Sequence, residues 1–219
     1  MSFLEDVLGV KRREVAALAS NPPGRPRAPR RPGFAEALRA PGLSVIAEIK
    51  RRSPSRGDIA PGLDVAATAR AYARGGAAAV SCLTERAFFG ARDGDFEAAG
   101  VAALPRLRKD FVIHELQIDE SAAMGAAAIL LIARILDDAR LAALHAYASG
   151  LDLDVLVEVH DESEIDRALA AGAAVIGVNN RDLATLSVDP RRAERLRPRI
   201  PAGVVSVAES GVRARADVE

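Results

Sequence analysis

The chain has 219 residues, in which 30 Lys and Arg balance 30 Asp and Glu to give a formal net charge of zero. This balance excludes the broad positive field that draws a protein to nucleic acid or to an anionic membrane, so we expect a small-molecule ligand. The sequence has no signal-peptide pattern, no apolar run of the roughly 20 residues that cross a bilayer, and a single cysteine, Cys82, all of which favour a cytoplasmic protein.

Residues 1–44 are predicted to precede the main domain. Residues 3–18 have the pattern of an amphipathic helix, and residues 22–32 are rich in Arg and Pro. A basic segment that binds nucleic acid is one interpretation of the second stretch. Because no aromatic residues are interleaved with its arginines, a solvated linker is the better one.

Residues 45–219 are predicted to form a parallel α/β barrel. Short apolar runs alternate with helical patterns, and three of the runs follow a helix-ending glycine and small residues, at Gly76, Gly125 and Gly172. Such alternation indicates βα units and a parallel sheet. The predicted strands are residues 45–51, 79–85, 106–111, 128–134, 155–160, 175–181 and 204–210.

Two helix starts are predicted from capping patterns. Asp161 is followed three residues later by Glu164, and Asp189 precedes Pro190, which would occupy the first helical position. The helix predicted around residues 95–103 contains Gly100, so we expect it to be short and weak.

Polar residues gather at the predicted strand ends, where parallel barrels carry their active sites. A single facing pair such as Glu48 and Lys50 is equally consistent with a structural ion pair. Burying charges from five strands without a function would cost several kcal/mol per ion, which favours a site. Lysines and glutamates this close also separate one another's pKa values, which suits proton transfer. The residues are Glu48, Lys50, Ser53, Lys109, Glu158, Asn179, Arg181, Glu209, Ser210 and Gly211.

Other chemistries have weaker support in the sequence. His114, His145 and His160 show no close ligand spacing, so no metal site is predicted. Cys82 has no evident His partner and is expected to be a buried thiol. The backbone N–H groups around Gly211 would suit a phosphate, although Ser-Gly alone is a weak signal.

The chain resembles the indole-3-glycerol-phosphate synthase family over nearly its whole length. The most specific patterns are Glu-x-Lys-x-x-Ser-Pro-Ser at residues 48–55 and Leu-Arg-Lys-Asp-Phe at residues 107–111. The resemblance implies a TIM (β/α)8 barrel with an extra N-terminal helix near its mouth. It also implies a decarboxylating lyase of tryptophan biosynthesis that converts 1-(2-carboxyphenylamino)-1-deoxyribulose 5-phosphate into indole-3-glycerol phosphate without cofactor or metal.

The resemblance also implies a role for each site residue. Lys109 would be the general acid, Glu158 a base in the dehydration, and Lys50, tuned by Glu48, would hold the anionic substrate. Asn179 would bind a sugar hydroxyl, and Glu209 would complete the polar network. The implied substrate-binding residues are Ser53 and Arg181 for the carboxylate, Ser210 and Gly211 for the phosphate, and Phe89, Phe111 and Leu131 for the aromatic ring.

One departure from the family pattern concerns the end of the chain, at Val218 and Glu219. We expect the final βα unit to be lacking, so an inactive truncated barrel is one alternative. A phosphoribosylanthranilate isomerase-like enzyme is a second, and a retaining glycosidase that uses Glu48 and Glu158 is a third. A monomer is expected, with possible association with other tryptophan-pathway enzymes.

Overall fold

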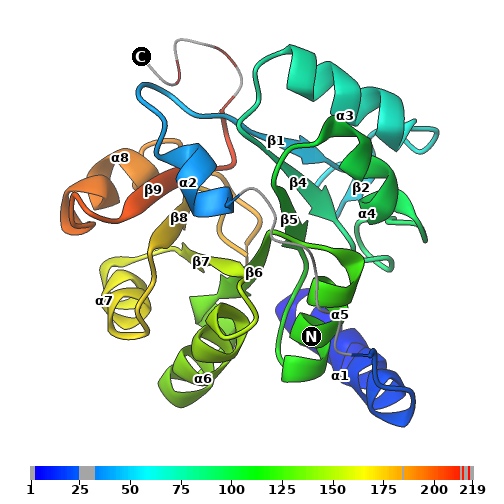
Figure 1. The fold of residues 1–219 in the computed structure, drawn as a ribbon. Coiled ribbons are helices and arrows are strands. Elements are labelled where there is room, and N and C mark those ends of the chain that lie inside the picture. The colour runs from blue at the N-terminus through cyan, green and yellow to red at the C-terminus, as the bar shows by residue number, and fades with distance from the viewer. Residues whose placement is uncertain (1–2, 25–32, 184, 213, 215–216, 218–219) are drawn as a thin grey trace.

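The computed structural model describes residues 3–24, 33–183, 185–212, 214 and 217. Within them, seven parallel strands form one curled sheet in the order β1-β4-β5-β6-β7-β8-β9 (Figure 1). Each predicted strand is confirmed, and each ends one or two residues before its predicted end. The strands are β1 (Ile46–Ile49), β4 (Ala79–Leu83), β5 (Arg106–Lys109), β6 (Ala128–Ile132), β7 (Asp154–Val159), β8 (Val175–Asn179) and β9 (Val205–Glu209).

Helices cover the outer face of the sheet (Figure 1). They are α3 (Val65–Arg74), α4 (Asp95–Ala98), α5 (Glu115–Met124), α6 (Asp138–Ser149), α7 (Glu162–Ala170) and α8 (Arg192–Leu196). Near the amino terminus, α1 (Phe3–Ser20) packs beside α5. The Arg- and Pro-rich stretch lies largely outside the described residues. No helix of the described residues is long and apolar enough to cross a membrane.

A short helix and a two-stranded ribbon were not predicted. Helix α2 (Phe34–Leu38) covers the amino-terminal opening of the curled sheet, where the backbone N–H of Ala35 donates to the Asp154 carboxylate at 2.9 Å. After β1, strands β2 (Arg52–Ser53) and β3 (Gly57–Asp58) pair as a small antiparallel ribbon. Ser53 therefore lies in this ribbon.

The glycine junctions explain how the helices give way to strands. Gly76, Gly125 and Gly172 have φ angles of 82°, 82° and 89°, in the left-handed region that side chains disfavour. In each case the strand begins three residues later, at Ala79, Ala128 and Val175. The repeated Gly-Ala pattern therefore marks a real repeated turn.

One predicted helix start is wrong, and the other is confirmed. Asp161 caps α7 by accepting a hydrogen bond from the backbone N–H of Glu164. Helix α8, in contrast, begins at Arg192, so Pro190 is not its first helical residue. Asp189 accepts from the N–H of Arg191 through its side chain and from that of Arg192 through its carbonyl. These bonds form a separate turn before the helix.

The helix predicted around residues 95–103 is short, as expected. Its α-helical part, α4, ends at Ala98 and continues as a 3₁₀ turn over Ala99–Ala102.

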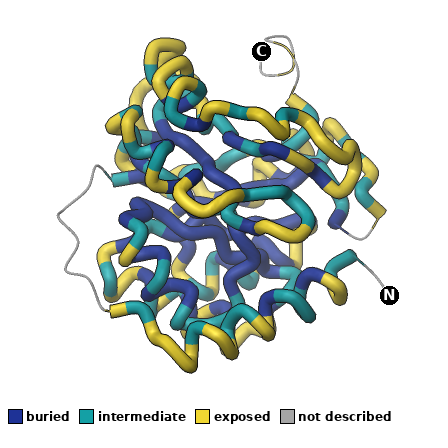
Figure 2. The backbone as a smooth tube through the Cα atoms, turned by 90° about the vertical axis from the view of Figure 1, so that its right-hand side faces the viewer, coloured by how far each residue is buried: buried dark blue, intermediate teal, exposed yellow. Residues whose placement is uncertain are grey.

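Alternate strand residues supply two apolar layers, one on each face of the sheet. The strands form much of the buried interior, drawn in dark blue in Figure 2. On β6, Ile129 and Leu131 pack in the outer layer between sheet and helices, whereas Leu130 and Ile132 belong to the inner layer. The same alternation sends the polar residue at the end of several strands inward. The sheet therefore places its charged groups inside the curl.

A buried ion pair attaches α1 to the end of β5. The Lys11 ammonium lies 2.6 Å from the Asp110 carboxylate, and both side chains are almost fully buried. Burial alone would lower the pKa of Lys11, but Asp110 outweighs it and the pKa is raised. Asp110 also accepts from Thr84 and from its own neighbour, the N–H of Phe111. The pair thus joins α1 to the segment that directly follows Lys109.

We expect Lys11→Met to lower the free energy of unfolding by about 2 kcal/mol, because Asp110 loses a buried hydrogen bond to a charged group while Arg108 remains nearby. Urea unfolding followed by circular dichroism measures the change. Arg12→Met, on the exposed face of the same helix, is the control and should leave stability nearly unchanged. Equal losses in the two variants would contradict this prediction.

Candidate active site

A cavity of about 810 Å³ runs along the inner face of the sheet, from the carboxyl ends of the strands to residues at strand starts such as Ile46 and Val205. The structure brings almost all predicted site residues to its wall, from strands β1, β2, β5, β7, β8 and β9 and from segments that follow β1, β4, β5, β8 and β9. Lining it are Glu48, Lys50, Ser53, Phe89, Lys109, Phe111, Glu158, Asn179, Arg181, Glu209, Ser210 and Gly211. Leu131 is the predicted residue that does not line it.

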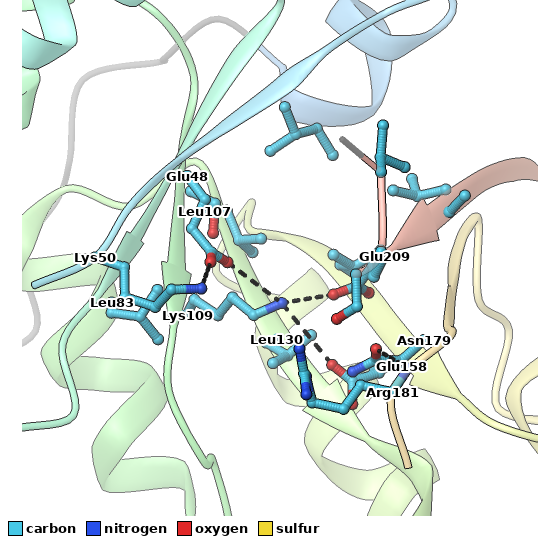
Figure 3. Close-up of a pocket in the computed structure, with 18 of the residues that line it drawn as sticks. Glu48, Lys50, Leu83, Leu107, Lys109, Leu130, Glu158, Asn179, Arg181 and Glu209 are labelled. Carbon is cyan, nitrogen blue, oxygen red and sulfur yellow. Dashed lines mark hydrogen bonds and ion pairs between the residues drawn. The ribbon is translucent and has the colours of Figure 1, made fainter. Parts of the chain in front are cut away.

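Lys109 lies at the centre of the charged groups in this cavity (Figure 3). Its Nζ atom is 2.5 Å from Glu209 Oε2 on β9, and 3.9 Å from both Glu48 Oε2 on β1 and Glu158 Oε2 on β7. Lys50 forms a second ion pair with Glu48. One ammonium group therefore contacts carboxylates from three strands that are far apart in the sequence.

These contacts determine the charge states of Lys109 and Glu48. Burial by itself would lower the pKa of Lys109, but Glu209, Glu48 and Glu158 outweigh burial and raise it. Burial would likewise raise the pKa of Glu48, but Lys109 and Lys50 outweigh burial and lower it. Lys109 is thus held as a cation and Glu48 as an anion near neutral pH.

Glu158 differs from the other carboxylates. Its side chain is 2% exposed, and burial together with the charge of Glu209 raises its pKa to about 7, against the opposing effects of Lys109, His160 and Asn179. A carboxyl group with such a pKa exchanges its proton near neutrality. Lys109 and Glu158 therefore place a cationic donor and a titrating carboxyl 3.9 Å apart.

The position of Glu209 depends on Gly177, a residue that sequence reasoning missed. Gly177 pairs with Val207 in the sheet, and its missing side chain leaves the space that Glu209 fills. A Cβ atom at residue 177 would lie 2.1 Å from Glu209 Oε1, far inside van der Waals contact. The backbone of β8 therefore allows Glu209 to reach Lys109.

Two buried hydroxyl groups face the cavity without a hydrogen-bond partner among the described residues. They belong to Ser53, which was predicted, and to Ser81 on β4, which was not. Unsatisfied buried polar groups are costly, so each hydroxyl is available to a ligand. Ser81 lies two residues before Leu83, which also lines the cavity, and residues two apart on a strand share a face. This spacing on a predicted strand is the sequence signal that could have identified Ser81.

Aromatic rings form one wall of the cavity. Phe89 and Phe111 lie 6.3 Å apart between ring centroids, and Phe3 of α1 meets Phe111 edge-on at the same separation. The prediction that Leu131 joins this wall is wrong, because Leu131 points to the helices. Leu130, one residue earlier, faces the cavity, since adjacent strand residues point to opposite faces.

The opposite rim is built from the segments that follow β8 and β9. Arg181 donates to the carbonyl of Leu186 at 2.7 Å, and Asn180 donates to the carbonyl of Ser210 at 3.0 Å. Ser210 and Gly211 both have positive φ angles, 64° and 84°. Among the described residues, no group of three or more His, Cys, Asp or Glu side chains is placed to hold a metal ion.

Comparison with known proteins identifies the family. The family model "Indole-3-glycerol phosphate synthase" matches residues 4–219. The chain belongs to the indole-3-glycerol phosphate synthase family. It is 47% identical to the indole-3-glycerol phosphate synthase of Chlorobium phaeovibrioides over 227 residues, covering 100% of this chain and 88% of that protein. Identity to indole-3-glycerol phosphate synthase 2 of Streptomyces coelicolor is 52% over 205 residues, covering 93% and 76%.

Solved structures show the same fold at low sequence identity. The N-acetylmannosamine-6-phosphate 2-epimerase of Clostridium perfringens superposes with a TM-score of 0.63 at 13% identity, covering 88% of this chain and 86% of that one. The 2-keto-3-deoxy-6-phospho-gluconate aldolase of Zymomonas mobilis gives 0.56 at 12% identity, covering 83% and 77%. These likenesses support the α/β architecture of parallel strands covered by helices.

In this member of the indole-3-glycerol phosphate synthase family, we expect Glu209→Gln to lower the pKa of Glu158, because Glu209 is the charge that raises it most. Carboxyl ¹³C NMR of the labelled protein follows the titration directly. Glu162→Gln, on the exposed face of α7, is the control. An unchanged Glu158 titration in Glu209→Gln would show that burial alone sets its pKa.

Proposed function

We propose that the chain catalyses the decarboxylating ring closure of 1-(2-carboxyphenylamino)-1-deoxyribulose 5-phosphate to indole-3-glycerol phosphate, a step of tryptophan biosynthesis. Family membership supports the reaction. The observation that carries the assignment of residues is the position of Lys109, in contact with carboxylates from three strands inside one cavity.

Lys109 acts as the general acid of ring closure. As the aromatic ring carbon attacks the substrate ketone, the ketone oxygen gains negative charge and takes a proton from the Lys109 ammonium. Loss of carbon dioxide then restores the aromatic ring. The surrounding carboxylates keep Lys109 protonated before this step, and the 2.5 Å contact with Glu209 holds its Nζ atom in place.

Glu158 acts as the base of the following dehydration. It removes a ring proton while the hydroxyl formed from the ketone leaves as water, taking the proton it needs from the Lys50 ammonium, which also lines the cavity. A carboxyl with a pKa of about 7 is well suited to this exchange at neutral pH, because both of its protonation states are populated. Asn179, which hydrogen-bonds Glu158, also lines the cavity and binds a sugar hydroxyl.

The substrate's remaining groups match the remaining walls of the cavity. Lys50 and Arg181 provide positive charge for its carboxylate, together with the free hydroxyl of Ser53. The backbone around Ser210 and Gly211 binds the phosphate. Phe89, Phe111 and Leu130 surround the aromatic ring, and Leu130 takes the place that the sequence analysis gave to Leu131.

The alternatives have less support. The curated relatives carry the name of the synthase and not of an isomerase. A glycosidase needs two carboxyl groups facing a glycosidic bond, yet the Lys109 ammonium lies 3.9 Å from both Glu48 and Glu158. The monomeric state, pathway partners and cytoplasmic location stay predictions.

We expect Lys109→Met to lower kcat by about 100-fold to 10,000-fold, the range typical of a lost general acid. The assay supplies the carboxyphenylamino sugar phosphate and follows indole fluorescence. Lys109→Arg keeps the positive charge but donates its proton poorly, so it should also lose most activity. Glu162→Gln is the surface control. Full turnover in Lys109→Met, or none in the wild type, would refute the proposal.

We expect Gly177→Ala to lower kcat by about 100-fold, because the new methyl group must displace Glu209 from Lys109. A double-mutant cycle distinguishes this effect from general damage to β8. In a Glu209→Ala background the space is already empty, so Gly177→Ala should cause little further loss. Losses that multiply in the double variant would contradict the predicted role of Gly177.

A further inference from the structure

His160 lies directly behind Glu158, just past the end of β7, and does not line the cavity. Its side chain is fully buried, and its Nε2 atom is 3.5 Å from Glu158 Oε1. Among the described residues, neither of these two atoms has a hydrogen-bond partner. Two buried unsatisfied atoms that face each other call for a physical explanation.

The other side of the imidazole fixes its tautomer. Glu164 Oε2 accepts from the backbone N–H of His160 at 2.7 Å and lies 3.1 Å from its Nδ1 atom. Burial raises the pKa of Glu164, but the contacts with His160 and Arg134 outweigh burial and lower it. Glu164 is therefore ionised and can only accept hydrogen bonds, so Nδ1 must carry a proton.

A single proton between His160 Nε2 and Glu158 Oε1 then satisfies both atoms. With Nδ1 protonated, the neutral ring offers a lone pair at Nε2, and the charged ring offers a second N–H. A protonated Glu158 can donate to the first form, and an ionised Glu158 can accept from the second. Without that proton, the Glu158 carboxylate would face the Nε2 lone pair at 3.5 Å.

We propose that His160 is a positioning residue that shares one proton with Glu158, and that Glu164 holds the imidazole in the tautomer that makes the sharing possible. The transfer breaks the Oε1–H bond of Glu158 and forms the Nε2–H bond of His160. The pair keeps the same total charge. Glu158 thereby becomes a carboxylate, able to act as a base, without releasing a proton to water. The catalytic part of this inference rests on the proposed function.

The charges around the pair are consistent with such a relay. On the cavity side, Glu158 faces Lys109 at 3.9 Å, with Glu209 beyond it and Asn179 beside it. On the outer side, Arg134 of the turn after β6 donates to Glu164 at 2.8 Å. Arg134 also pairs with Asp161 and Asp182, which fixes it in place. Glu158 and Glu164 therefore lie against opposite nitrogen atoms of the His160 ring.

The sharing is tested first in the protein without substrate. The ¹⁵N chemical shift of His160 Nε2, assigned with the His160→Asn variant, should lie between the values of protonated and unprotonated imidazole nitrogen at neutral pH. In Glu158→Gln, whose amide has no proton to share, it should move to the unprotonated value. A wild-type shift at either extreme, or no change in Glu158→Gln, would overturn the proposal. This readout is independent of any activity.

The catalytic consequence is tested by the pH dependence of kcat/KM. His160→Asn keeps an amide near Nδ1 for Glu164 but removes the contact with Glu158. In this variant we expect the acid limb of the kcat/KM profile to shift to higher pH by about one unit, because the Glu158 carboxylate loses a cationic partner. His160→Gln reaches Glu158 but takes no proton, so its limb should shift in the same way.

The control is His145→Asn on α6, which should leave the acid limb in place. A uniform loss of rate without a shift in either His160 variant would mean that His160 is merely structural and would overturn the relay. An inactive wild type would refute the proposed reaction and leave the ¹⁵N result to decide whether the proton is shared.

Discussion

The structure depends most on the contact between the Lys109 ammonium and three carboxylates. In this cluster Lys109 and Lys50 contribute two positive charges, and Glu48, Glu158 and Glu209 contribute three negative charges when all are ionised. The surplus of one negative charge is costly in a buried site. A proton on Glu158, the most buried of the three, removes the surplus. The raised pKa of Glu158 therefore follows from the composition of the whole cluster.

The same strand end connects the cluster to the rest of the fold. Asp110 follows Lys109, faces away from the main charged group, and binds Lys11 of α1 in a buried pair. Helix α1 also brings Phe3 against Phe111 in the cavity wall. A helix from the amino terminus is thereby joined, by one ion pair and one ring contact, to Asp110 and Phe111, the two residues that follow Lys109. The attachment of α1 therefore contributes to the shape of the cavity and to the stability of the fold.

The strands could be predicted because their signals are local. Gly125, for example, takes the left-handed backbone conformation that ends α5, and the apolar run after it forms the buried strand β6. Predictions failed where two local solutions were nearly equal. Leu130 and Leu131 are chemically identical in a strand that is apolar throughout, so the sequence does not say which faces inward. Pro190 fitted a helix start, but the side chain of Asp189 stabilised a separate turn.

Site residues could be predicted where charge made them conspicuous, and were missed where their role depends on a neighbour. Glu158 stands out as a charge in a largely apolar strand, and Lys109 as the charged last residue of β5. Gly177, in contrast, is an ordinary glycine until Glu209 of the next strand lies over it. The sequence analysis considered His160 only as a metal ligand. Its contacts with Glu158, two residues earlier, and with Glu164, four residues later, depend on how the chain bends between β7 and α7. Such residues act by shaping or charging another side chain, so only the packed arrangement of strands and helices reveals them.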